Sequence, residues 1–498
     1  MNALHQPTQP AQLDPAIARI LPQHLDLYYG GQWHAPAGGY AATLNPANQQ
    51  MLAHAAEANT ADVDAAVRAA QQGFLAWKRV PATEKANMLR EISRRLRLHG
   101  DELALLDSAN CGNPVAEMGR DVLWAAAQID YYAGLVHELK GQTIPSADGA
   151  LNYTLLEPLG VVVRIVACNH PLMFMAAKMS PVLASGNSVV MKAPVQAPLS
   201  AYRFAEIIDG ILPPGVFNVL TGGRECGEAL VQHPLVKKVS LIGSVPTGAA
   251  ILRNAADKIM PVTLELGGKN PLVICPDADL DKAIQGAING MNFMWAGQSC
   301  GSTSRCFVHE SLYDQVLAGI CERLPKQHVC GIPTDPATTM GCLVSEAQFN
   351  KVSQYIEIAH AEGARLVCGG KRPDDPALAN GWFMEATVFA DVMPGMRIFR
   401  EEVFGPILSI MKWQDEEQLI ADINSVEYGL TAAIYTRDLS TAHRLAGRIE
   451  SGYVWINTTG AHYLGVPFGG YKKSGIGREE CLEELYSYMQ VKNVHVML

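Results

Sequence analysis

The sequence has no long apolar run, no excess of basic residues and no start that resembles a secretion signal. Its 498 residues include 39 Lys and Arg against 49 Asp and Glu, and the charges are scattered rather than clustered. No stretch reaches the roughly 18 uninterrupted apolar residues of a membrane-spanning helix, and the first twenty residues lack both a basic start and an apolar core. We therefore expect a cytoplasmic protein without a membrane or nucleic-acid partner.

Paired cysteine motifs are also missing. The eleven cysteines, an odd number, show neither CxxC spacing nor the Cys and His intervals of a zinc site. We expect free thiols in a reducing compartment and no bound metal. The composition, 48% hydrophobic and 18% charged without repeats or low-complexity segments, is typical of a globular enzyme. A chain of this length exceeds a single core, so two or three domains are expected.

From residue 160 onward the sequence contains short apolar runs that alternate with helical patterns. The predicted strands cover residues 160–168, 188–192, 216–220, 239–242 and 262–266. Helices are predicted between them over 171–183 and 199–211. Strands separated by helices of this length indicate βαβ units and a parallel sheet, whose ligands bind beyond the carboxyl ends of the strands.

A second alternating series predicts another α/β domain. It begins with a strand at 271–275, and helical patterns follow over 280–293 and 345–362. Upstream of both series, apolar residues repeat at three to four residue spacing over 60–74 and 86–98, which predicts two further helices.

The two ends of the chain differ from the segments between them. Residues 1–23, punctuated by Pro and Gln, are expected to form a polar arm. The tail at 488–498 alternates apolar and polar residues and lies outside both predicted domains. A terminal strand of this kind is expected to pair with another subunit.

Two of the predicted strands end in residues suited to phosphate or ribose. The run from Gly243 to Gly248 ends a strand and opens a helix, so its N–H groups are placed to receive a pyrophosphate, although no GxGxxG fingerprint occurs in the chain. Lys192 ends a buried strand, either as a lysine that reaches solvent or as a donor to a ribose or phosphate.

Two other residues are candidates for chemistry. Glu265 lies on an otherwise apolar strand, and it is turned to solvent, paired with a cation such as Lys269, or retained as a base. Cys300 lies in NFMWAGQSCGSTSR between small and polar residues that leave the thiol accessible and offer it hydrogen bonds. It is either a buried apolar residue or a nucleophile.

Taken together, these motifs resemble the signatures of the aldehyde dehydrogenase superfamily. Glu265 in LELGGK precedes Cys300 in GQSC by 35 residues. The other matching motifs, in the family's order, are NHP at 169–171, GSxxxG at 243–248, EEVFGP at 401–406 and PFGGYKKSGIGRE at 467–479. The resemblance covers nearly the whole chain.

The resemblance implies an α/β fold with three parts. They are a Rossmann-like parallel-sheet dinucleotide-binding domain at 24–137 and 160–267, a second α/β catalytic domain at 268–479, and a small β oligomerisation element at 138–159 and 480–498. A homodimer or homotetramer is implied as well.

The resemblance also assigns roles to the matching residues. Cys300 would be the nucleophile, Asn169 with the Cys300 N–H the oxyanion hole, and Glu265 the base that activates water. For the cofactor, Lys192 would face the adenosine ribose, Gly243 and Ser244 the pyrophosphate, Glu402 the nicotinamide ribose, and Phe404 would pack nearby. The implied reaction is NAD(P)-dependent oxidation of an aldehyde to its acid through a thiohemiacetal and a thioacyl intermediate, because members that transfer the acyl group to coenzyme A commonly lack the Glu.

Two departures from the family pattern bear on specificity. Val195 stands where the family usually has an acid that holds the ribose 2′-hydroxyl, so NAD is expected from family frequency and NADP stays open. Cys168 and His170 replace the usual aromatic residues on either side of Asn169. His170 is interpreted as a packed turn residue, with a proton relay as the alternative.

The residues that match the family's aldehyde tunnel are Phe174, Met294, Trp295 and Tyr463. They predict an apolar or aromatic aldehyde, or else they are ordinary core. Betaine aldehyde, held by aromatic rings, and a semialdehyde, held by Arg164, are the alternatives within the fold, although Arg164 also suits a structural ion pair. A cofactor-independent cysteine esterase and a non-catalytic protein that keeps the fold are the alternatives from other classes.

Overall fold

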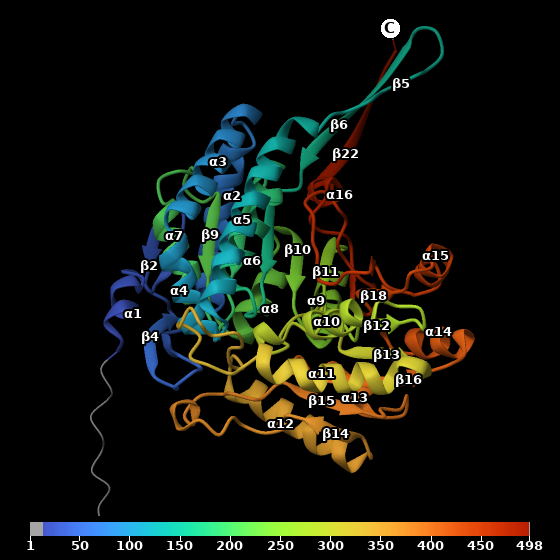
Figure 1. The fold of residues 1–498 in the computed structure, drawn as a ribbon. Coiled ribbons are helices and arrows are strands. Elements are labelled where there is room, and N and C mark those ends of the chain that lie inside the picture. Colours follow the sequence, from blue (N-terminus) through green and yellow to red (C-terminus); the bar gives the residue numbers. More distant parts are fainter. Residues whose placement is uncertain (1–12, 498) are drawn as a thin grey trace, which may run out of the picture.

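The structure, a computed structural model, describes residues 13–497, which form five β-sheets and the helices around them (Figure 1). Two large sheets make up the body of the molecule, and a three-stranded ribbon projects from it. No described helix is both long enough and apolar enough to cross a bilayer.

The first large sheet has eight strands and a parallel centre. Its order is β2-β1-β9-β8-β7-β10-β11-β21. The parallel strands are β9 (Phe217–Leu220), β8 (Ser188–Lys192), β7 (Val161–Ile165), β10 (Val236–Ile242) and β11 (Val262–Glu265). The antiparallel edges are β1 (Leu27–Tyr29) with β2 (Gln32–His34), and β21 (Gly475–Ile476). The α/β class and the parallel core are therefore confirmed, within a sheet that is mixed overall.

Helices cover both faces of this sheet because its strands are apolar on both sides. On β7, Val161 and Val163 pack into one core and Val162 into the other, as the two-residue period of a strand requires. The first core receives α2 (Thr60–Trp77), α8 (Arg224–Gln232) and α9 (Val245–Ala256). The second receives α3 (Ala82–Leu98), α4 (Gly100–Cys111), α5 (Val115–Leu135), α6 (Pro171–Ala184) and α7 (Leu199–Ile208).

The second large sheet has seven strands in the order β14-β15-β16-β13-β12-β18-β19, and only β14 is antiparallel. The strands are β14 (Arg365–Cys368), β15 (Thr387–Ala390), β16 (Ile407–Trp413), β13 (Arg305–His309), β12 (Pro271–Ile274), β18 (Thr431–Tyr435) and β19 (Tyr453–Ile456). The helices around it are α10 (Leu280–Gly290), α11 (Tyr313–Gln327), α12 (Glu346–Ala361), α13 (Arg397–Arg400), α14 (Glu416–Asn424) and α15 (Leu439–Ala446). One core of buried side chains joins the sheet to these helices.

The C-terminal strand, which was expected to pair with another subunit, is paired within the chain. β22 (Met489–Met497) runs antiparallel to β6 (Ala150–Pro158) over all nine residues, and β5 (Thr143–Ile144) adds a third strand. The segments assigned to one β element thus do associate, although α16 (Leu482–Tyr486) packs against α6. The division into domains stays a prediction.

The polar arm expected at residues 1–23 is wrong for the described part of that segment, and residues 1–12 lie outside the described residues. Asp14 caps the short helix α1 (Pro15–Ile20), and Ile17 is buried in a small core with Leu106 of α4. Many strands lie outside the ranges predicted from the sequence. In the first sheet and the small sheets they are β1, β2, β3 (Tyr40–Leu44), β4 (Met51–Ala56), β5, β6, β17 (Tyr428–Gly429), β20 (Tyr471–Lys472) and β21, and in the second sheet they are β13, β14, β15, β16, β18 and β19.

Candidate active site

The Cys300 loop is shaped by residues in the left-handed region. The helix predicted to reach residue 293 ends at Gly290, because Asn292 (φ +56°) and Ala296 (φ +49°) enclose a single 3₁₀ turn at Phe293–Trp295. Gly297 (φ +67°) follows, and a Cβ added there would lie 2.2 Å from the Gly405 carbonyl oxygen. Only glycine allows this approach, which brings the Cys300 loop against the EEVFGP segment.

Asn270 ties the end of the Glu265 segment to the Cys300 loop. Its amide nitrogen donates to the carbonyl oxygens of Cys300 (2.7 Å) and Ser302 (2.9 Å). Its side-chain oxygen accepts from the N–H of Thr431 at 3.0 Å. Sequence reasoning missed this residue, although a polar side chain directly before the apolar strand β12 was a usable signal.

The Cys300 thiol is held in its neutral form. Burial raises its pKa to about 12, and the carboxyl groups of Glu402 and Glu265 add to the rise. The N–H groups of Cys300 and Gly301 act in the opposite direction by hydrogen bonding to the sulfur. Both predicted carboxyl residues therefore lie close enough to Cys300 to affect its charge.

Glu265 is buried at the carboxyl end of β11 and is only 5% exposed. Within the described residues, neither of its carboxyl oxygens has a hydrogen-bond partner. Burial, reinforced by the charge of Glu479, raises its pKa well above the usual range. Of the three readings of this residue, solvent exposure and pairing with Lys269 are excluded, since the Lys269 ammonium is itself buried without a partner and burial lowers its pKa to about 7.

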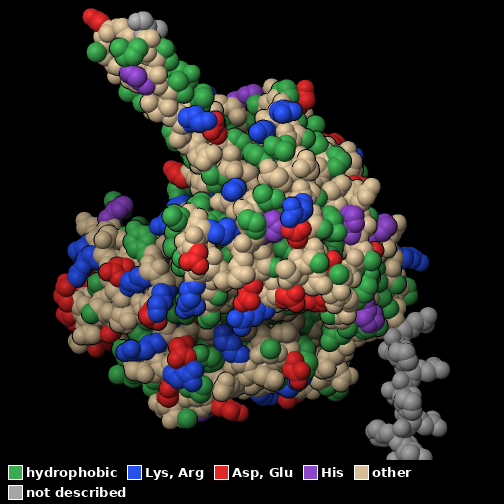
Figure 2. All heavy atoms as spheres, turned by 180° about the vertical axis from the view of Figure 1, so that it is seen from behind, with side chains coloured by type: hydrophobic (Ala, Val, Ile, Leu, Met, Phe, Trp, Pro, Cys, Tyr) green, Lys and Arg blue, Asp and Glu red, His purple; other side chains and the backbone are tan. Residues whose placement is uncertain are grey.

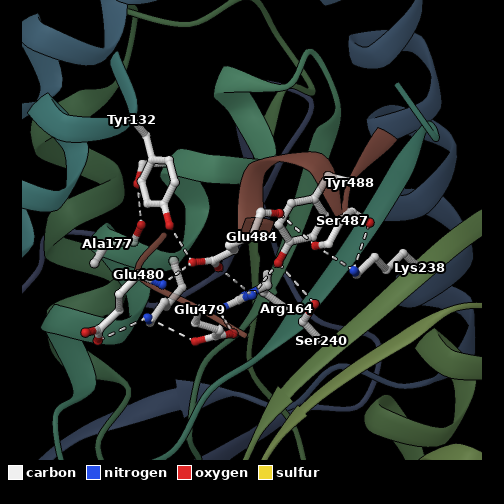
Figure 3. Close-up of polar contacts among 12 residues, drawn as sticks. Tyr132, Arg164, Ala177, Lys238, Ser240, Glu479, Glu480, Glu484, Ser487 and Tyr488 are labelled. Carbon is white, nitrogen blue, oxygen red and sulfur yellow. Dashed lines mark hydrogen bonds and ion pairs between the residues drawn. The ribbon is translucent and has the colours of Figure 1, made fainter. Parts of the chain in front are cut away.

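A buried ionic network surrounds Glu479, whose charge acts on Glu265 (Figure 3). Lys178 of α6 contacts Glu479 at 3.0 Å and Glu480 at 3.7 Å, and Arg164 of β7 contacts Glu479 at 2.9 Å and Glu484 at 3.5 Å. Although burial alone raises the pKa of Glu479, Arg164 and Lys178 bring it below the ordinary value. Arg164 is thus a structural ion-pair residue.

Asn169 and His170 begin helix α6. The Asn113 side chain donates to the Asn169 carbonyl oxygen at 2.7 Å, which fixes the backbone of the turn. His170 Nδ1 lies 2.7 Å from an Asp121 carboxyl oxygen, and both residues are buried. The His170 ring also stands edge-on to Trp295 with centroids 4.8 Å apart, so the NHP turn lies against the turn that precedes Cys300. His170 is a packed turn residue, which agrees with its interpretation from the sequence.

The predicted cofactor residues from the first sheet lie at the carboxyl ends of parallel strands. Lys192 is the last residue of β8. Gly243 follows β10, and Ser244 caps the exposed N-terminus of α9, where its hydroxyl accepts from the N–H of Thr247. This arrangement fits a dinucleotide, since a helix N-terminus at a sheet edge favours a pyrophosphate.

Glu402 and Phe404 lie between helix α13 and strand β16 of the second sheet. A Glu402 oxygen accepts from the Gly268 N–H at 2.9 Å, and a Cβ on Gly267 would lie 2.1 Å from the other oxygen. The glycines of LGGK are needed here because they admit the carboxyl group. Phe404 has φ +56°, and its carbonyl oxygen accepts from the Gln348 side chain at 2.6 Å.

Two of the four predicted pocket residues contact the same neighbouring ring. Phe174 and Trp295 both contact the His170 ring edge-on, at 5.5 and 4.8 Å between centroids. Met294 lies beside Trp295 in the same 3₁₀ turn. Tyr463 is 64% exposed and shares no ring contact with the other three in the part of the chain that is described. Its role stays a prediction.

Comparison with known proteins places this site in a family. The model of the aldehyde dehydrogenase family matches residues 33–494, so the chain belongs to that family, and the predicted enzyme class is confirmed. Among individual proteins, it is 50% identical over 491 residues to aldehyde dehydrogenase tropH of Talaromyces stipitatus, covering 97% of this chain and 95% of the relative.

Solved structures of the family share the fold closely. The NAD+ complex of aldehyde dehydrogenase from Bacillus cereus superimposes with a TM-score of 0.93 at 37% identity, covering 98% of this chain and all of that one. Betaine aldehyde dehydrogenase from Staphylococcus aureus, in complex with NAD+, gives a TM-score of 0.93 at 34% identity over 96% and 95% of the two chains.

The charge of Glu402 is testable through the reactivity of Cys300. At pH 9, replacing Glu402 by Gln is expected to speed alkylation of Cys300 by iodoacetamide about tenfold, as a pKa lower by roughly one unit would do. Peptide mass spectrometry measures the rate, with Cys321 in the same sample as the reference thiol, because its pKa is lowered to about 7 by a hydrogen bond from Cys368. An unchanged ratio of the two rates would contradict the electrostatic coupling.

Proposed function

We propose that the protein oxidises an aldehyde to its carboxylic acid with NAD(P), through a thiohemiacetal and a thioacyl intermediate on Cys300. The observation that carries the proposal is that Glu265, at the carboxyl end of β11, acts on the thiol of Cys300, which lies in the turn before β13 of the other large sheet. Asn270 supports that arrangement through its bonds to the Cys300 loop.

The first step is addition of the sulfur to the carbonyl carbon. The thiol passes its proton to water, an S–C bond forms, and the carbonyl oxygen becomes an oxyanion. The side-chain amide of Asn169 and the N–H of Cys300 are the donors proposed for it, and one such donor contributes about 3 kcal/mol. The N–H groups of Cys300 and Gly301 already point toward the sulfur and favour its anion.

The nicotinamide cofactor, when bound, accepts the hydride that leaves the thiohemiacetal carbon. Lys192, Gly243, Ser244, Glu402 and Phe404 are the residues that would hold it. NAD is favoured because the Bacillus cereus and Staphylococcus aureus structures contain it. Among residues 13–497 the ammonium of Lys192 has no hydrogen bond or ion pair, as expected of a group that waits for a ligand.

Glu265 is proposed to activate the water that hydrolyses the thioacyl group. Water transfers a proton to the Glu265 carboxylate, its oxygen bonds to the acyl carbon, and the C–S bond breaks to release the acid and the Cys300 sulfur. A carboxylate without hydrogen bonds is a strong base, because burial raises its pKa.

The substrate is proposed to be an apolar or aromatic aldehyde. Phe174 and Trp295 support this choice, because both rings contact the ring of His170, the residue that follows Asn169. Betaine aldehyde is the alternative, because rings also hold quaternary ammonium groups and the Staphylococcus aureus neighbour is a betaine aldehyde dehydrogenase. A semialdehyde bound by Arg164 has lost its support, because that guanidinium is committed to Glu479 and Glu484.

The cysteine esterase has no support from the geometry either. None of the described histidines hydrogen-bonds to Cys300, whereas a cysteine hydrolase needs a base next to its sulfur. A cytoplasmic location is proposed from the sequence, and the eleven cysteines are all free in the structure, which accords with a reducing compartment.

The role of Glu265 is testable with a single substitution. Glu265→Gln keeps the shape of the side chain but removes the base, so mixing with aldehyde and NAD+ is expected to give one equivalent of NADH per site and then a stall. Rapid-mixing absorbance measures the burst, and intact mass spectrometry detects the acyl adduct. Cys300→Ala is the control, for which NAD+ binds but neither burst nor adduct forms. Steady turnover of Glu265→Gln at the parent rate would remove Glu265 from its role.

Assembly into a homodimer or homotetramer is the second part of the proposal. Figure 2 shows hydrophobic side chains along the ribbon that projects from the body of the molecule. The exposed apolar residues on this ribbon are Ile144, Leu151, Leu155, Val491 and Met497. An apolar ribbon of this kind is suited to burial against another copy of the chain.

The assembly is expected to depend on the face of the ribbon that carries Leu151 and Leu155, since side chains two residues apart on β6 share a face. Wild-type protein should elute as a dimer or tetramer in size-exclusion chromatography with light scattering, and Leu151→Lys with Leu155→Lys should shift it to smaller species. Asn493→Ala is the control that leaves the mass unchanged, because this exposed residue of β22 lies on the opposite face. A monomeric wild type would contradict the proposal.

A further inference from the structure

Near Lys192, at the carboxyl end of β8, residue 195 does not supply an acidic side chain. Val195 is 40% exposed and offers neither a charge nor a hydrogen-bond acceptor through its side chain. A ribose at this strand end, as the proposed function places it, would therefore have the ammonium of Lys192 but no carboxylate from that segment. A carboxylate from elsewhere in the chain lies nearby.

Glu57 is that carboxylate. It directly follows β4, far from Lys192 in sequence, and one of its oxygens accepts from the N–H of Gly223 at 3.0 Å. Gly223 is the N-cap of α8, so the Glu57 carboxylate sits at the positive end of a nine-residue helix. The side chain is half-buried, and only one of its two oxygens is used by this bond among residues 13–497.

Lys192 lies against the same helix, one turn further on. A Cβ on Gly227 would be 3.8 Å from Lys192 Cε, and a Cβ on Gly223 would be 3.9 Å from the Glu57 oxygen. Since residues four apart on a helix are neighbours at about 5–6 Å, the two charged side chains flank one face of the first turns of α8. Small residues at both positions leave that face open.

The two charges do not neutralise each other by contact. Within the described residues no ion pair joins Lys192 to Glu57 or to any other carboxylate, although Lys192 is only 9% exposed. Burial lowers the pKa of Lys192, and the charges of Cys226 and Glu57 oppose that effect. A nearly buried ammonium without a partner, beside a carboxylate with a spare oxygen, is a site shaped for a polar ligand.

We propose that Glu57 takes the place of the acid missing at Val195: together with Lys192 it binds the two hydroxyl groups of the adenosine ribose, and its charge makes the enzyme select NAD over NADP. The inference rests on the proposed function, in which Lys192 faces that ribose. A carboxylate accepts hydrogen bonds from a 2′-hydroxyl, whereas a 2′-phosphate would bring close to two negative charges against it.

The charge of Glu57 is the quantity to change. Glu57→Gln keeps an oxygen for the Gly223 N–H but removes the charge, so the ratio of kcat/KM for NADP+ to that for NAD+ is expected to rise at least about tenfold. Nucleotide binding without aldehyde, followed by quenching of protein fluorescence, should show the same change in the ratio of Kd values. Glu225→Gln is the matched control, because this nearby carboxylate on α8 accepts from Thr60 and its loss should leave the ratio within about twofold.

A second substitution restores a negative charge, now at position 195. Val195→Glu in the Glu57→Gln background is expected to return the ratio to its wild-type value. If Glu57→Gln does not fold, Val195→Glu alone still tests the inference: it should lower NADP+ use by less than about twofold where Glu57 already repels the phosphate, and a tenfold drop overturns it.

The outcomes separate the inference from the function beneath it. A wild type that binds neither nucleotide defeats the proposed function. If the wild type binds NAD+ and Glu57→Gln has the same ratio of NADP+ to NAD+ use, the role of Glu57 is overturned. A wild type that prefers NADP+ also overturns it. Both results leave the proposed function standing.

Discussion

The buried position of the Glu265 carboxyl group and the half-buried position of the Cys300 thiol are the constraint on which the site depends. Removing charge from water is costly, so Glu265 and Cys300 both favour their neutral forms where the structure places them. Because burial favours the neutral form of Glu265, it limits the negative charge that this carboxyl group brings beside the sulfur. The water needed for hydrolysis is also the hydrogen-bond partner that the carboxyl group lacks, so its arrival would favour the charged form that acts as a base.

The rest of the fold maintains this condition. Gly297 lets the Cys300 loop approach the backbone of Gly405, and Asn270 holds the loop by two hydrogen bonds. Arg164 and Lys178 neutralise Glu479, which would otherwise raise the pKa of Glu265 still further. Removing one partner from a buried network of this kind leaves an unpaired charge and lowers stability, so the charged groups hold one another in place.

Much of the first sheet was predictable because its strands are apolar throughout and its helices follow at regular intervals. The strand predicted at 188–192 coincides with β8, and the helix predicted at 171–183 differs from α6 by one residue. The strands β1 and β2 of the N-terminal segment were missed because three residues carry no readable period. The partner of β22 was missed because strand pairing is a long-range property.

In the candidate site, too, some residues could be identified from the sequence and others could not. Cys300 and Glu265 were identifiable because a carboxylate on an apolar strand and a thiol among small residues are locally unusual. The contribution of Glu57 was not, since its importance comes from a contact with Gly223, which lies far away in sequence. The choice among the three interpretations of Glu265 likewise required the structure, because burial is not local information.

The burial of Glu265 is tested most directly by the pH at which its carboxyl group loses its proton in the nucleotide-free enzyme, because burial raises the pKa of this group well above the ordinary value. Infrared difference spectroscopy between the wild type and Glu265→Gln measures this directly, because a protonated carboxyl group and a carboxylate absorb in separate regions. We expect a protonated carboxyl band that is absent in the variant and is lost from the wild type only as the pH rises well above the pKa of an ordinary glutamate. Loss of that band at the pH where an ordinary glutamate ionises would contradict this expectation.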